Sequence, residues 1–250
     1  MNARRTMIAL ALTAALPVVA QAQGLPDGKG LVARHVAAMG GREAMDKHTS
    51  LHMTGTFSMA AMGLEGPIHM WRAKPDKFVQ TIIIGSFGES AQGFDGTTAW
   101  VNQPGAGYMI LSGEMATQAK SQADFFAEFP EPGKYSSIET VALEDFEGRK
   151  CYKVKLVKVT GGETIQYFDA ETGLAAGAIR STETPMGKID VTVVLSDYQE
   201  QGGVKMPSRV IQKTPQGDVL LVFTVYEWDN VDPAVFNLPD GVKAMIPKPN

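Results

Sequence analysis

The chain has 250 residues, of which 44% are hydrophobic and 20% are charged, with 26 glycines and 14 prolines. This composition excludes a disordered chain, a collagen-like repeat and a disulfide-dense miniprotein, and the length favours one folded domain. Lysine and arginine number 23 against 27 aspartates and glutamates, and no basic cluster offers a surface for a phosphate backbone. We therefore expect no nucleic-acid partner.

The first 22 residues have the pattern of a secretory signal peptide. Arg4 and Arg5 precede an apolar run over residues 7–20, and small residues occupy the two positions that a signal peptidase reads before a cut after Ala22. The run is shorter than the ~20 residues of a membrane-spanning helix. We expect export to the periplasm, cleavage near Ala22 and a single domain over residues 23–250 that is neither lipidated nor an integral membrane protein. The export route, Sec or twin-arginine, stays open.

The mature chain begins with helical spacing and then changes to the period of strands. Apolar residues over 31–45 are interrupted by Gly40 and Gly41, which predicts two short helices. From Leu51 onward apolar and polar residues alternate, and turn pairs recur at short spacing, so we expect one antiparallel, meandering sheet. Strands are predicted over residues 51–59, 64–72, 77–84, 87–94, 98–102, 108–111, 141–146, 152–159, 163–169, 175–182, 188–198, 204–213 and 218–228.

The last of these strands is apolar on both faces. Val219, Leu221, Phe223 and Val225 alternate with further apolar residues at 220, 222 and 226. This pattern predicts a central strand covered on both sides. The alternative is a strand packed beneath helices.

One interior segment, residues 113–129, contains no turn pair and is rich in alanine, glutamine and glutamate. Met115, Ala119, Ala123 and Phe126 fall along one stripe, which predicts an amphipathic helix. Two interpretations stay open. The helix either packs on the sheet as core or forms a lid over an apolar cavity on the concave face.

Catalytic and metal-binding patterns are not found. His48 and His52 have the spacing of zinc ligands but straddle a change from helix to strand, and His52 and His69 can meet on neighbouring strands but lack a placed carboxylate. Cys151 is the one cysteine and is expected to be a half-buried structural thiol. No G-x-S-x-G elbow and no glycine-rich phosphate loop occurs. We expect no metal, no cofactor and no enzymatic activity, with a hydrolase of unrecognised site as the least favoured alternative.

Three segments together resemble a known family. Residues 71–78 (WRAKPDKF) resemble the pattern W-x-x-[RK]-P-x-x-F of the periplasmic lipoprotein carriers of the outer-membrane sorting pathway. Residues 94–100 (FDGTTAW) resemble their D-G-x-T-x-W hairpin, and residues 235–242 (VFNLPDGV) resemble their closing F-x-x-P-x-G-V. The three segments occur in the family's order and bracket most of the mature chain.

The resemblance implies an open, strongly curved antiparallel sheet, an unclosed barrel whose concave face is covered by helices around an apolar cavity. In the carriers that cavity holds acyl chains, and an arginine before the proline latches the lid by binding lid-helix carbonyls. Lysine replaces that arginine here, so Lys74 is the latch candidate, although a lysine lacks the planar fork that bridges two carbonyls. The ligand-binding candidates are Met115, Ala119, Phe126, Trp71, Phe78 and Trp100.

The sequence thus leads to a periplasmic protein that holds an acyl chain, a lipoprotein or another lipophile in an apolar cavity under a helical lid. Members of the family that sense envelope damage provide the second hypothesis, an envelope-sensing or protein-interaction module with other envelope proteins as partners.

Overall fold

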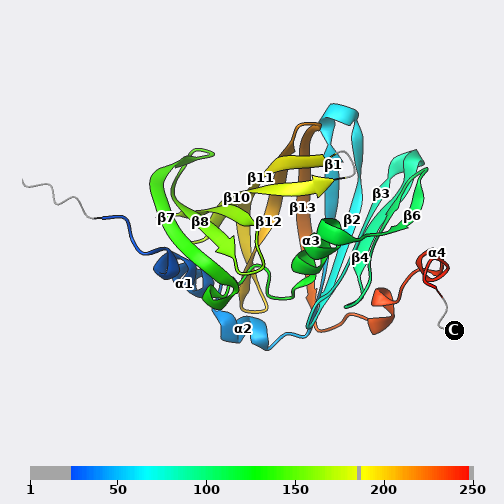
Figure 1. The fold of residues 1–250 in the computed structure, drawn as a ribbon, viewed down its shortest axis with the longest axis horizontal. Coiled ribbons are helices and arrows are strands. Elements are labelled where there is room, and N and C mark those ends of the chain that lie inside the picture. Colours follow the sequence, from blue (N-terminus) through cyan, green and yellow to red (C-terminus); the bar gives the residue numbers. More distant parts are fainter. Residues whose placement is uncertain (1–23, 185–186, 248–250) are drawn as a thin grey trace, which may run out of the picture.

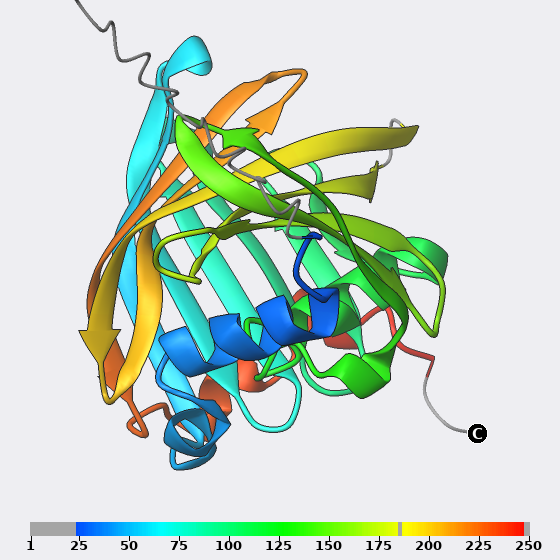
Figure 2. The same ribbon diagram turned by 90° about the vertical axis from the view of Figure 1, so that its left-hand side faces the viewer.

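A computed structural model describes residues 24–184 and 187–247, so the predicted signal peptide lies outside the described residues. The strands are β1 (Ser50–Met59), β2 (Leu64–Ala73), β3 (Lys77–Ile84), β4 (Gly88–Phe94), β5 (Ala99–Gln103), β6 (Gly107–Ile110), β7 (Tyr135–Phe146), β8 (Arg149–Lys158), β9 (Glu163–Asp169), β10 (Ala175–Thr184), β11 (Gly187–Gln201), β12 (Val204–Thr214) and β13 (Gly217–Trp228). They form one antiparallel sheet of 13 strands in the order β6-β5-β4-β3-β2-β1-β13-β12-β11-β10-β9-β8-β7. The sheet is strongly curved and does not close (Figures 1 and 2), which confirms the predicted fold class.

The helices are short, and they lie at the concave side, at the ends of strands or, for α4, against the outer face. They are α1 (Gly28–Ala38), α2 (Arg42–Asp46), α3 (Gly113–Ala123) and α4 (Asp240–Lys243), with single 3-10 turns η1 (Ala60–Met62), η2 (Gly85–Phe87), η3 (Pro132–Lys134) and η4 (Pro233–Phe236). Figure 2 shows α1 lying across the concave side of the sheet. None of the helices in the described ranges is long and apolar enough to cross a membrane.

The alternation of apolar residues placed most strands to within a few residues, but β7 begins at Tyr135 instead of residue 141. The added stretch contributes only two large apolar side chains, Tyr135 and Ile138, which pack partly buried beneath α1. Two such residues are too few for an alternating pattern to be recognised.

The last strand, β13, is central as predicted, between β1 and β12, but only one of its faces is buried. A β-bulge also changes which residues of β13 face the core, because Thr54 pairs with Val225 whereas the next residue, Gly55, pairs with Phe223. The extra residue reverses the side on which the following side chains lie. Val225, predicted to face the core with Phe223, is therefore 46% exposed, and Tyr226 takes the inner position.

The concave face holds most of the core. Around β1 to β5 it is built from buried methionines and aromatic residues, including Met53, Met70, Phe78 and Phe94. Around β8 to β10 it packs against α1. This division means that two segments cover the concave face, α1 on one side and the region around α3 on the other.

The helix α3 ends at Ala123, six residues before the predicted end. Asp124 leaves the helical conformation, and its carboxylate accepts a hydrogen bond from the backbone N–H of Phe126 at 3.0 Å. Aspartate competes with helix formation in this way. Phe125 instead donates its backbone N–H to the carbonyl of Pro75 at 3.1 Å. Residues 124–134, here called the inner cover, therefore form an irregular segment and not a continuation of the helix.

A second segment covers the outer face of β2 to β6. Residues 231–243, here called the outer cover, include η4 and α4 and follow β13 (Figure 1). Phe236 and Val242 pack in one cluster with Trp100, which is 4% exposed. The contact of α4 is close, since a Cβ atom on Gly241 would lie 2.3 Å from the ring of Tyr108. The C-terminal motif thus seals the outer face.

Candidate functional site

A groove runs between α1 and the inner cover. Its volume is about 300 Å³, which is at the lower end of the range of small-molecule sites, roughly 300–1,000 Å³. Its walls are mainly apolar and consist of Val32, Ala33, Val36, Arg42, Phe129, Pro130, Glu131 and Pro132. Phe129 separates the groove from the concave face, because this residue both lines the groove and packs in the core.

Two phenylalanines anchor the inner cover to the concave face. Phe125 and Phe129 are each 1% exposed and pack in the same cluster as Phe78 and Ala99. Full burial of a phenylalanine side chain contributes roughly 1.5–3 kcal/mol. The two rings thus fill the space between the inner cover and the concave face of the sheet.

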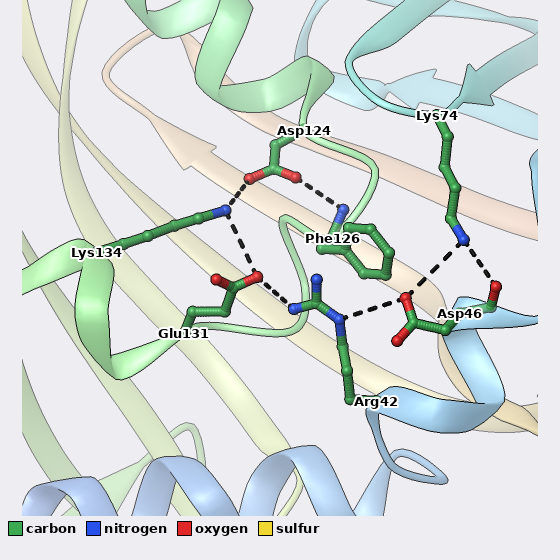
Figure 3. Close-up of polar contacts among 7 residues, drawn as sticks. All are labelled: Arg42, Asp46, Lys74, Asp124, Phe126, Glu131 and Lys134. Carbon is green, nitrogen blue, oxygen red and sulfur yellow. Dashed lines mark hydrogen bonds and ion pairs between the residues drawn. The ribbon is translucent and has the colours of Figure 1, made fainter.

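Charged side chains connect the inner cover to α2 (Figure 3). Lys134 Nζ lies 2.6 Å from Asp124 Oδ2 and 3.9 Å from Glu131 Oε1. Glu131 forms an ion pair with Arg42, and Arg42 Nε lies 3.7 Å from Asp46 Oδ1. All of these side chains are about a third or more exposed. Exposed pairs contribute only about 0–1 kcal/mol each, so the network holds the cover weakly.

The latch candidate Lys74 occupies the other end of this network. Its Nζ donates a hydrogen bond to the carbonyl oxygen of Asp46 at 2.8 Å, and it lies 5.2 Å from the ring centroid of Phe126. The guanidinium of Arg42 lies 3.6 Å from the centroid of the same ring. The carbonyl that accepts the hydrogen bond from Lys74 therefore belongs to α2 and not to α3. Lys74 contacts the inner cover, which follows α3, through the aromatic ring of Phe126.

A smaller, polar cavity is lined by Glu128 of the inner cover. Its volume of about 50 Å³ has room for a few water molecules but not for an acyl chain. His35 lines it and is 4% exposed, with Nε2 at 3.3 Å from the carbonyl oxygen of Glu128 and no hydrogen-bond partner for Nδ1. Burial lowers the pKa of His35, which favours the neutral imidazole. Gln166 and Tyr135 complete the polar part of the lining.

The overall structure is similar to three solved bacterial structures. A LolA superfamily protein from Nitrosomonas europaea is 13% identical with a TM-score of 0.55, over 86% of this chain and 99% of that chain. A DUF1329 family protein from Desulfovibrio piger is 12% identical (TM-score 0.54; 85% and 98%). A domain from Vibrio parahaemolyticus, described as an outer membrane lipoprotein-sorting protein, is 10% identical (TM-score 0.52; 84% and 97%).

The chain has the fold of the LolA superfamily. This confirms the fold that the three sequence motifs imply. A scan of protein-family models and a search of curated sequences match nothing, so the likeness concerns the fold alone.

Within this LolA fold the six predicted ligand residues fall into two groups. Phe78, Ala119 and Phe126 belong to the cluster on the concave face, and Met115 is half-buried on α3. Trp71 and Trp100 belong to the cluster under the outer cover, on the opposite face of the sheet, and none of the six residues lines the groove. Side chains on a strand alternate between the two faces, and the motif that contains Trp71 and Phe78 gives no indication of which face is concave.

The outer face also carries a histidine pair whose partner the sequence did not indicate. His52 Nδ1 lies 2.9 Å from Glu227 Oε2, and His52 Nε2 lies 3.2 Å from His69 Nδ1. The ring of Trp71 stacks on His52 with a centroid separation of 4.7 Å. The predicted meeting of His52 and His69 is thus confirmed, and Glu227 is added by the pairing of β1 with β13. In the described part of the chain, no group of three or more His, Cys, Asp or Glu side chains is arranged so that it could hold a metal ion.

Cys151 is fully buried on the face opposite to α1, more than the half-burial predicted. Burial raises the pKa of its thiol to about 11, so the reactive thiolate is disfavoured. This agrees with a structural role.

Proposed function

We propose that this protein is a periplasmic carrier or binding protein that holds the acyl chain of a lipid or lipoprotein between its concave face and the inner cover, without catalysing a reaction. The observation that carries the proposal is the position of Phe129. This residue closes the apolar groove on one side and fills the concave face on the other. A chain that enters the groove must therefore displace the ring of Phe129 to reach the concave face.

The free-energy cost of releasing the inner cover is similar in size to the gain from burying an acyl chain in its place. Releasing Phe125 and Phe129 from the core costs roughly 3–6 kcal/mol if neither finds new apolar contacts. Each methylene of an acyl chain that takes their place contributes about 0.8 kcal/mol, so roughly four to eight buried methylenes offset the loss. The exposed ion pairs of the cover add little to this cost. A lipid tail is therefore long enough to open the cover.

The test is binding of a dansyl-labelled fatty acid to the purified protein, with mass spectrometry of lipids that co-purify. Ala33→Trp places a large ring in the groove at an exposed position of α1, and we expect it to weaken binding about tenfold or more, the loss of roughly two methylene contacts. Ala106→Trp is the matched control, since Ala106 is exposed in the turn between β5 and β6. It should bind like the parent.

If the parent binds no labelled fatty acid and carries no co-purified lipid, the carrier function is wrong. The second hypothesis, an interaction module with a protein partner, would then be favoured. Equal weakening by both tryptophan variants would show that the groove is not the entry to the site.

A further inference from the structure

Arg72 lies on β2 beneath the inner cover and is buried without an ion-pair partner among the described residues. Its side chain is 8% exposed, and its Nε atom has no hydrogen-bond partner. None of the ion pairs in the described part of the chain includes it. A guanidinium stays charged in proteins, and a buried charge without a counter-charge is strongly unfavourable. The site is therefore incomplete in the closed arrangement.

The strand geometry directs Arg72 into the interior. Its neighbours Trp71 and Ala73 belong to the outer cluster, so Arg72 faces the concave side. There it is paired across the sheet with Leu51 and Phe78, which are both buried, and its guanidinium lies 5.7 Å from the centroid of the Phe78 ring. The side chains paired with Arg72 across the sheet are thus apolar and offer its guanidinium no hydrogen-bond acceptor.

The nearest negative charges belong to the inner cover. Burial lowers the pKa of Arg72, and the charges of Glu128 and Asp124 partly offset this effect. Asp124 is already engaged by Lys134, at 2.6 Å. When the cover opens, both carboxylates move away with it, and Arg72 is left facing whatever enters. An incoming anion would then take over the role of counter-charge.

We propose that Arg72 is the binding site for the acidic group of an anionic amphiphile, a carboxylate or phosphate carried on an apolar chain. That the acidic group is carried on an apolar chain rests on the proposed function and on the apolar side chains that surround Arg72 on the concave face. Guanidinium binds carboxylates and phosphates through paired, charge-assisted hydrogen bonds. The arrangement matches a molecule with one charged end and a tail that replaces Phe125 and Phe129.

The experiment compares a labelled fatty acid with its methyl ester, which has the same chain but no charge. For the parent protein we expect the acid to bind at least roughly tenfold more tightly, as a hydrogen bond to a charged group implies. Arg72→Met should bind acid and ester equally and retain the ester affinity of the parent. Arg72→Lys should keep part of the preference. Arg72→Met should also melt no lower than the parent, because an unpaired buried charge is replaced by an apolar side chain of similar length.

Free acetate and inorganic phosphate separate an amphiphile from a simple anion. Neither should raise the melting temperature of the parent. If either does so in the parent but not in Arg72→Met, the site takes free anions and the amphiphile proposal is wrong. Equal binding of acid and ester by the parent, or a preference that survives in Arg72→Met, would overturn the role of Arg72 and leave the proposed function intact. Failure of both probes to bind would instead contradict the proposed function.

Discussion

Two irregular segments, the inner cover and the outer cover, bring phenylalanines to opposite faces of the same sheet, yet they are built differently. The outer cover places Phe236 and Val242 against Trp100, and its Lys243–Asp240 pair is internal to α4. The inner cover has a groove on one side and a polar cavity on the other, and exposed ion pairs connect it to α2. The outer contact has the character of a permanent core, whereas the inner contact is suited to exchange with a ligand.

The largest effect is expected from Trp100→Ala, which tests whether the outer contact is part of the permanent core. Loss of this buried ring should lower the free energy of unfolding by roughly 3–5 kcal/mol, because a large cavity is left under the outer cover. Urea denaturation measures the loss. Added fatty acid should stabilise this variant by the same amount as the parent. A variant that melts like the parent would show that the outer cover is not part of the core.

Phe129→Ala removes an equally buried ring from the inner cover. We expect a loss of about 3 kcal/mol, at the lower end of the range for such truncations, because the irregular backbone around it can move into the space. Fatty acid should restore more stability here than in the parent, since the tail fills the space that the ring leaves. Thermal melts with and without the ligand measure this. No added gain over the parent would remove the distinction between the two covers.

The smallest effect is expected from Lys134→Gln, which removes the ion pairs to Asp124 and Glu131. Global stability should change by less than about 1 kcal/mol, because these side chains are exposed. Amide hydrogen exchange of residues 124–134 should nevertheless become faster, since the cover opens more often. Lys243→Gln, which removes an exposed pair of the outer cover, is the control and should leave exchange of the inner cover unchanged.

Local patterns predicted the strands well because each depends on neighbours in the chain. Alternation located β3 and β9 to the residue, and Asp95 with Gly96 marked a tight turn in which the aspartate accepts from the N–H groups of Thr97 and Thr98. The end of α3 was missed because the backbone N–H of Phe125 donates to the carbonyl of Pro75, which is distant in sequence. The bulge in β13 was missed because one extra residue in a strand leaves no mark in an alternating apolar pattern.

The candidate site was predicted only in part, for a related reason. Ala119, Phe126 and Phe78 pack in one cluster on the concave face, whereas Trp71 and Trp100 lie on the outer face. No sequence pattern marked Glu227 or Arg72 as part of a site, because a carboxylate or a guanidinium on a strand is ordinarily exposed to solvent. Their roles depend on which strands are adjacent and which segment covers them.

The sequence by itself determined that this chain forms an antiparallel sheet of short hairpins and that Trp71 and Arg72 face opposite sides, because side chains alternate along any extended strand. Only the tertiary structure decided which of those sides is concave. Curvature and the docking of the two covers depend on contacts between residues far apart in the chain, such as Phe125 with Pro75 and Phe236 with Trp100. These contacts place Arg72 on the concave face and Trp71 on the outer face, and no local sequence pattern indicates which face each of them takes.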